Sequence, residues 1–172
     1  MRYDALSKLT IRLKTSRIYL ASPYGFSRHW KERLLPDLIN VLEEFDGLEV
    51  LEPFQGNSDA DFNEPGVAHN VALKNLKDVY RSDAIFAVVN GTPPDEGVMI
   101  ELGASIAWGK EIFLFRDDFR QCSDSMDYPL NLMLFAGLPW PEWKNNYFSS
   151  VDEIRNCDKG LSKWLNNNKL ID

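Results

Sequence analysis

The sequence has few of the residues that build metal sites or disulfide frameworks. Its 172 residues include two cysteines, Cys122 and Cys157, and two histidines, His29 and His69. These four residues share no metal-ligand spacing, and two distant cysteines do not form a disulfide framework. We therefore expect reduced thiols and no metal ion.

Basic residues and long apolar runs are also scarce. There are 19 Lys and Arg against 26 Asp and Glu, a formal net charge of −7. A nucleic acid or an anionic membrane would favour a basic surface, so we expect neither as a partner. No run approaches the length of a membrane span, and residues 1–17 lack the apolar stretch of a secretory signal. The chain is expected to be cytoplasmic and to bind small molecules.

Glycine-rich phosphate loops are missing as well. The first loop, SPYG at residues 22–25, has one glycine and no following GK, so the dinucleotide-binding and Walker patterns are absent. We expect no cofactor.

Apolar runs that alternate with amphipathic segments predict an α/β fold. Strands are expected at 17–21, 48–53, 83–89 and 111–115, and helices within 26–45, near 67–81, at 98–109 and at 151–166. This order predicts one domain over 1–172, a flavodoxin-like, doubly wound sandwich. Its central, mostly parallel sheet would have four to five strands, with helices on both faces. Ligands of such sheets bind at the carboxyl ends of the strands.

A carboxylate, Glu101, lies in a predicted helix that is otherwise apolar. Burying a carboxylate is costly unless it is paired or used chemically. In a purely structural interpretation Asp95 caps this helix, and Glu96 and Glu101 favour its positive end. In a functional interpretation Glu101 is a nucleophile or base, and Asp95 handles the proton. Gly97 lets the backbone approach whatever lies beside it.

Several aromatic residues lie at the same predicted edge of the sheet. Tyr19 ends the first strand, where it is either an ordinary sheet tyrosine or a hydroxyl that orients Glu101 and tunes its pKa. Phe26, Trp30 and Phe54 lie on or just after loops at this edge. They either join the core or stack on a planar ring.

Three segments make the chain resemble the nucleoside 2-deoxyribosyltransferase family, which also includes nucleoside and nucleotide N-hydrolases. They are IYLASPYGF at 18–26, LKNLKDVYRSDAIFAVVNGTPPDEGVMIELGASIAWGK at 73–110 and PLNLML at 129–134. The D-x-G-x3-E-x-G pattern that begins at Asp95 is the most specific part. The resemblance implies that nucleosides and nucleobases are the ligands and that the pathway is purine or pyrimidine salvage.

The resemblance also implies roles for individual residues. Glu101 matches the nucleophile that attacks the anomeric carbon of a 2′-deoxynucleoside, and Asp95 matches the acid that helps protonate the departing base. Tyr19 matches the tyrosine that hydrogen-bonds the nucleophile. Asn131 matches an asparagine that reaches the sugar's 5′ side, usually in a neighbouring subunit's site, so a homo-oligomer with shared sites is implied.

Further positions are implied to bind substrate: Ser22, Phe26, Gln55, Asn75, Gly97 and Met133. Asn75 stands where many members have an aspartate that contacts the base. An amide can both donate and accept hydrogen bonds, so the purine or pyrimidine preference stays open.

Three hypotheses follow. The first is a transferase that moves 2-deoxyribose between nucleobases without cofactor or metal. The second is an N-hydrolase of nucleosides or nucleoside 5′-monophosphates, which would need phosphate donors; the candidates are Ser22, Ser27, Arg28 and Ser105. The third is a non-catalytic nucleotide-binding module, because fold alone does not fix function.

Overall fold

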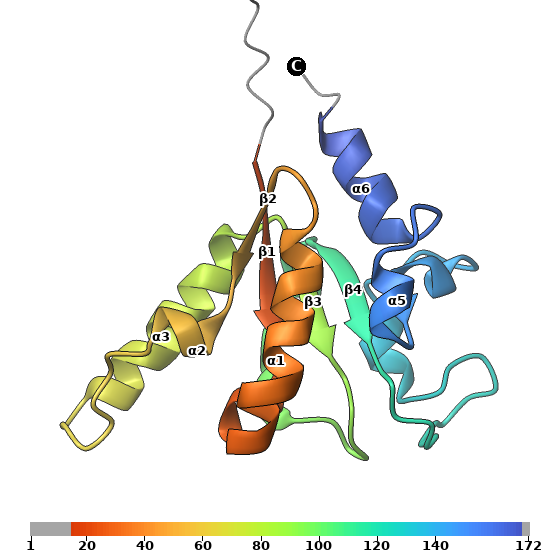
Figure 1. The fold of residues 1–172 in the computed structure, drawn as a ribbon. Helices are drawn as coiled ribbons and strands as arrows, with labels where there is room; N and C mark the ends of the chain where they lie inside the picture. The colour runs from red at the N-terminus through yellow and green to blue at the C-terminus, as the bar shows by residue number, and fades with distance from the viewer. Residues whose placement is uncertain (1–14, 170–172) are drawn as a thin grey trace, which may run out of the picture.

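The computed structural model describes residues 15–169, which form a five-stranded parallel sheet between two layers of helices (Figure 1). The strands are β1 (Ser16–Ala21), β2 (Leu48–Leu51), β3 (Ala84–Val88), β4 (Glu111–Phe115) and β5 (Tyr147–Phe148), in the order β2-β1-β3-β4-β5. Every neighbouring pair is parallel. The predicted flavodoxin-like α/β fold is confirmed.

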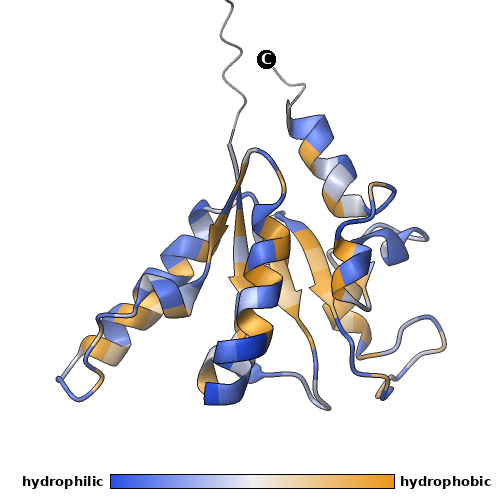
Figure 2. Cartoon of the chain, viewed as in Figure 1, coloured by the Kyte–Doolittle hydropathy of each residue, from blue (hydrophilic) through white to orange (hydrophobic). Residues whose placement is uncertain are grey.

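The sheet is hydrophobic because helices cover both of its faces (Figure 2). All five residues of β3 are buried, as the continuous apolar run predicted. One face packs against α1 (Arg28–Glu43), α5 (Val151–Ile154) and α6 (Gly160–Lys169). The other packs against α3 (Val67–Arg81), α4 (Glu96–Ala107) and the short 3-10 helices η2 (Leu132–Phe135) and η3 (Trp143–Asn146).

Two short elements lie in the loops that follow β1 and β2. They are η1 (Pro23–Phe26) and α2 (Pro53–Gly56), and each begins with a proline. Proline suits the first helical position because the missing N–H would have no partner there. These elements place the aromatic residues of both loops at the carboxyl edge of the sheet.

The structure differs from the sequence prediction near the C-terminus. The single helix expected at 151–166 is two helices, α5 and α6. The side-chain oxygen of Asn156 accepts a hydrogen bond from the Asp158 N–H, and the Asn156 carbonyl accepts one from the Lys159 N–H. Asparagine commonly folds the chain into a turn in this way, and this turn separates the two helices. Within residues 15–169, no helix is both long and apolar enough to cross a membrane.

Candidate active site

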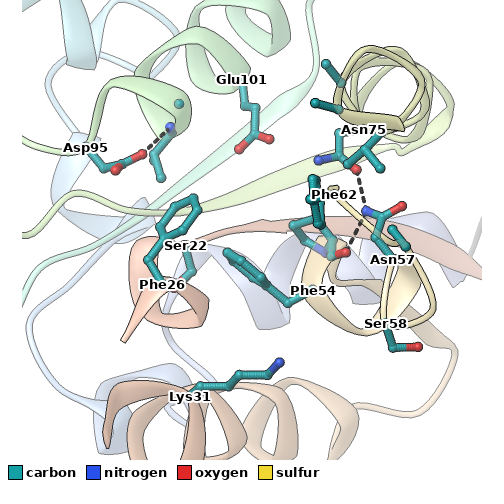
Figure 3. A pocket seen from close by; sticks show the side chains of 17 residues that line it. Ser22, Phe26, Lys31, Phe54, Asn57, Ser58, Phe62, Asn75, Asp95 and Glu101 are labelled. Carbon is teal, nitrogen blue, oxygen red and sulfur yellow. Dashed lines mark hydrogen bonds between the residues drawn. The ribbon is translucent and has the colours of Figure 1, made fainter. Parts of the chain in front are cut away.

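A cavity of about 610 Å³ opens at the carboxyl ends of β1, β2 and β3 (Figure 3). It is lined by Ser22, Phe26, Lys31, Pro53, Phe54, Asn57, Ser58, Ala60, Phe62, Ala68, Val71, Ala72, Asn75, Asp95, Gly97, Val98 and Glu101. This volume suits a small molecule. Six of the ten predicted site residues, Glu101 among them, therefore line one cavity.

Glu101 reaches this cavity from the second turn of α4. The Tyr19 hydroxyl donates a hydrogen bond of 2.6 Å to Glu101 Oε1, across 82 residues of sequence. Glu101 Oε2 has no hydrogen-bond partner among residues 15–169. Because Tyr19 holds one oxygen in place, the other is left with free lone pairs, as a nucleophile requires.

Burial raises the pKa of Glu101 to about 7. The hydrogen bond from Tyr19 lowers that pKa, whereas the negative charges of Asp95 and Glu52 raise it further. Burial also raises the pKa of Tyr19 far above its usual value, and the charge of Glu101 adds to the effect. Tyr19 therefore stays protonated at neutral pH and acts as a hydrogen-bond donor to Glu101.

The position of Asp95 is compatible with both interpretations that the sequence left open. It is the N-cap of α4, and its Oδ1 accepts a hydrogen bond of 3.0 Å from the Val98 N–H. It also lines the cavity that holds Glu101. Its Oδ2 has no hydrogen-bond partner among the described residues, so this oxygen is free to contact a ligand.

Two phenylalanines form an aromatic wall between η1 and α2. The rings of Phe26 and Phe54 meet edge to face, with centroids 5.0 Å apart. A methyl group on Gly25 would lie 2.1 Å from the Phe54 ring, so only glycine leaves room for this ring. Phe26 is 77% exposed, which leaves its surface available to a planar ligand.

Glu52 supports the aromatic wall, and the sequence interpretation missed it. Its side chain is the N-cap of α2 and accepts hydrogen bonds from the Phe54 and Gln55 N–H groups, at 3.0 and 2.7 Å. Glu52 is 6% exposed, and burial raises its pKa. Pro53, which directly follows Glu52, was a local signal that a helix begins at this point.

Asn75 lines the cavity from α3 and contacts a second asparagine. Asn57 Nδ2 donates to Asn75 Oδ1 at 2.9 Å and to the Pro53 carbonyl at 2.7 Å. Figure 3 shows both hydrogen bonds at the side of the cavity that carries Phe62. The sequence interpretation named Asn75 but not Asn57, because this contact depends on the path of the loop.

Gln55, Asn131 and Met133 do not line this cavity. Gln55 lines a neighbouring cavity of about 330 Å³ between α1 and α2. Asn131 is the N-cap of η2, where it donates to Asp124 Oδ2 and accepts from the Met133 N–H. The Met133 side chain is 65% exposed. Gln55 misses the larger cavity for a local reason. The Glu52 cap fixes the orientation of α2, and in this orientation Pro53 and Phe54 line the larger cavity whereas Gln55 does not.

A buried arginine holds the loop that leads to Asp95. Arg116 follows β4, and its guanidinium donates hydrogen bonds to the carbonyl oxygens of Val89 and Gly91. The Asn90 side chain in turn donates to the Tyr24 hydroxyl and to Asp117. These contacts join the ends of β3 and β4 and position the start of α4.

Most of the phosphate-donor candidates lie elsewhere. Ser22 lines the cavity, but Ser27 and Arg28 do not, and Arg28 pairs with Glu32. Ser105 is buried, and its hydroxyl donates to the Glu101 carbonyl. Lys31 is the one cation among the lining residues. Among residues 15–169, no group of three or more His, Cys, Asp and Glu side chains is placed to hold a metal ion.

The family model described as nucleoside 2-deoxyribosyltransferase matches residues 18–133 of the chain. That range includes Tyr19, Asp95, Glu101 and every residue that lines the larger cavity. None of the curated proteins matches the chain at a significant level.

Three solved structures share the fold. A 2-deoxyribosyltransferase from Bacillus psychrosaccharolyticus is 25% identical with a TM-score of 0.62, and the match covers 82% of this chain and 91% of that one. A 2-desoxiribosyltransferase from Leishmania mexicana is 25% identical with a TM-score of 0.61, over 88% and 97%. A conserved protein from Enterococcus faecalis V583 is 21% identical with a TM-score of 0.62, over 82% and 98%.

Proposed function

Because the chain belongs to the nucleoside 2-deoxyribosyltransferase family, we propose that it transfers 2-deoxyribose from one nucleobase to another through a covalent intermediate on Glu101. One observation carries this proposal. The Tyr19–Glu101 hydrogen bond fixes a half-buried carboxylate in a cavity that also holds Asp95. A retaining N-glycosidic cleavage needs a carboxylate nucleophile and a proton donor of this kind.

In the first half-reaction, Glu101 Oε2 attacks the anomeric carbon of a bound 2′-deoxynucleoside. A carbon–oxygen bond forms as the bond to the base nitrogen breaks, and its electron pair passes to the base. Asp95 passes a proton from solvent to the departing base, which neutralises it. The products are a free base and a deoxyribosyl ester of Glu101.

In the second half-reaction, another base occupies the position that the first one left. Its ring nitrogen attacks the anomeric carbon, the ester bond breaks, and Glu101 regains its charge as a carboxylate. Asp95 takes up the proton that the incoming base loses. The apolar residues Val98 and Leu102 beside Glu101 are buried, which limits the access of water to the ester and favours transfer over hydrolysis.

A nucleoside or nucleotide N-hydrolase is the second candidate. Lys31 favours it, because its ammonium group makes no ion pair or side-chain hydrogen bond among the described residues while it lines the cavity. A free ammonium could face a 5′-phosphate. Water would then replace the second base as the acceptor.

The test is incubation of the protein with 2′-deoxyadenosine or 2′-deoxyinosine, with and without excess thymine or cytosine, followed by chromatography of every product. A new deoxynucleoside that forms only with the second base supports transfer. Free deoxyribose that appears at the same rate with or without acceptor makes the protein a hydrolase, and 5′-monophosphates are then tested. Folded protein that turns over none of these substrates overturns both and favours the binding module.

Two variants identify the nucleophile. Glu101→Gln keeps an oxygen that can accept from Tyr19 but cannot form the ester, so it should be inactive. Asp95→Asn should still gain the mass of one deoxyribosyl group from a substrate whose base leaves without a proton. A deoxyribosyl adduct on any residue other than Glu101 would reject the mechanism.

A further inference from the structure

We propose that Asn57 sets the base preference of this site by locking the Asn75 amide, so that Asn75 offers a hydrogen-bond donor to the nucleobase. This inference rests on the proposed function in that it takes the cavity to be the base site. It narrows the class of base to those that present an acceptor toward Asn75, either a ring nitrogen or a carbonyl oxygen.

The Pro53 carbonyl determines the orientation of the Asn57 amide. A carbonyl oxygen can only accept, so the Asn57 atom 2.7 Å away must be the amide nitrogen. The same nitrogen lies 2.9 Å from the Asn75 amide. Asn75 must therefore place its oxygen toward Asn57, because two amide nitrogens would repel each other.

This lock leaves the Asn75 nitrogen free. Asn75 Nδ2 makes no hydrogen bond within residues 15–169. In Figure 3 this nitrogen lies on the side of the amide that faces Glu101, opposite the oxygen that contacts Asn57. A half-buried N–H group without a partner is costly, so a ligand that accepts from it gains affinity.

The polar groups of the cavity lie on different elements. Asp95 and Glu101 supply carboxylate oxygens at α4, Asn75 supplies neutral N–H groups from α3, and the Lys31 ammonium is a separate donor on α1. A base that turned its own N–H toward Asn75 would leave two donors facing each other. An aspartate at this position would present an acceptor and favour the opposite edge, so the identity of residue 75 and the lock by Asn57 together select the edge.

The test measures binding of free nucleobases, which needs no turnover. Dissociation constants are measured by calorimetry for adenine and its 1-deaza, 3-deaza and 7-deaza analogues, and for cytosine, 3-deazacytosine and 2-thiocytosine. Each deaza analogue removes one ring-nitrogen acceptor, and 2-thiocytosine replaces the carbonyl oxygen with sulfur, a weaker acceptor. Wild-type protein should bind one of the analogues about tenfold more weakly than it binds the parent base of that analogue, as expected for one lost hydrogen bond.

The variants separate the donor from its lock. Asn75→Leu should bind that analogue and its parent equally, and Asn75→Asp should bind the parent more weakly than Asn75→Leu does. Asn57→Ala leaves Asn75 free to turn over, so the tenfold difference should shrink while folding, followed by circular dichroism, is kept. Asn70→Ala, at an exposed asparagine of α3 that does not line the cavity, is the control that keeps the difference.

The inference is overturned if wild-type protein binds neither parent base, or binds every analogue as well as its parent. The lock alone is rejected if Asn57→Ala discriminates as wild type does. Failure of the proposed function is a separate result: an inactive protein that still shows this binding pattern keeps the inference, and an active one that lacks it keeps only the function.

Discussion

The charge of Glu101 changes within the neutral pH range, because burial raises its pKa to about 7. If ionised Glu101 is the nucleophile, kcat/KM should fall as pH decreases through about 7. Initial rates of transfer between pH 5 and 9 measure this acid limb of the pH–rate profile. The pH dependence of kcat/KM reports the pKa values of groups in the free enzyme.

Tyr19→Phe tests the cause of that limb. The Tyr19 hydrogen bond favours ionised Glu101, so its removal should raise the pKa of Glu101 and move the acid limb to higher pH. The maximal rate should also drop, because the carboxylate loses its fixed orientation. A limb that stays in place in Tyr19→Phe would mean that another group titrates.

Glu101 should also cost the protein stability. Its pKa in the folded state, about 7, lies above the ordinary value of 4.5, so folding favours the protonated form. The stabilisation from protonation is complete below pH 4.5 and is lost as pH rises through 7. Glu101→Gln should thus be more stable than wild type at pH 8, by at most about 3 kcal/mol, with the gap closing toward pH 4.5.

Urea denaturation at pH 4.5 and pH 8 measures this difference. Glu96→Gln is the matched control, because Glu96 is exposed in the first turn of the same helix and has no burial cost to relieve. A Glu101→Gln protein that is less stable than wild type at pH 8 would contradict the prediction.

At the scale of elements, the aromatic wall depends on how closely η1 and α2 approach. Gly25→Ala places a methyl group on the Phe54 ring, which must then move away from Phe26. We expect KM for the nucleoside to rise about tenfold, on the scale of lost stacking on an aromatic ring, with a smaller change in kcat. Steady-state kinetics separates the two constants.

Gly103→Ala is the control for this prediction. A methyl group there meets nothing within 4 Å and lies in the interior of α4, where alanine is favoured over glycine by about 1 kcal/mol. Its KM should stay at the wild-type value. Equal KM values for Gly25→Ala and wild type would show that the wall does not bind the substrate.

Hydrophobic periodicity predicted the main strands and helices because each buries one apolar stripe or run. It missed α2 and the division between α5 and α6, since both depend on side chains that bond to the nearby backbone, Glu52 and Asn156. It also missed β5, whose two residues are too few to show a period. Local hydrogen bonding decided these boundaries.

At the scale of the whole molecule, the sheet order explains which site residues the sequence could bring together. Asp95 and Glu101 lie on one helix, so their proximity follows from spacing alone. The parallel pairing of β1 with β3 brings Tyr19 to Glu101, as the α/β topology implied. The contact between Asn57 and Asn75 depends on the path of a long loop, which neither periodicity nor motif reveals.

Asn131 gives the last prediction, because it lies outside the cavity of its own chain. The large apolar side chains of Leu132 and Met133, which follow it directly in the sequence, are exposed, as expected for a surface that another subunit covers. We expect a homo-oligomer in which Asn131 completes a neighbour's site. Glu101→Ala and Asn131→Ala should then each be impaired alone yet recover activity when co-expressed.

The size of that recovery follows from the pairing of subunits. If sites are shared across a two-fold interface, random association of equal amounts puts about half of the subunits in mixed pairs. One of the two sites in each mixed pair then has both Glu101 and Asn131, so activity should reach about a quarter of wild type. Light scattering measures the assembly, and a mixture that only averages the two variants would show that each chain builds its site alone.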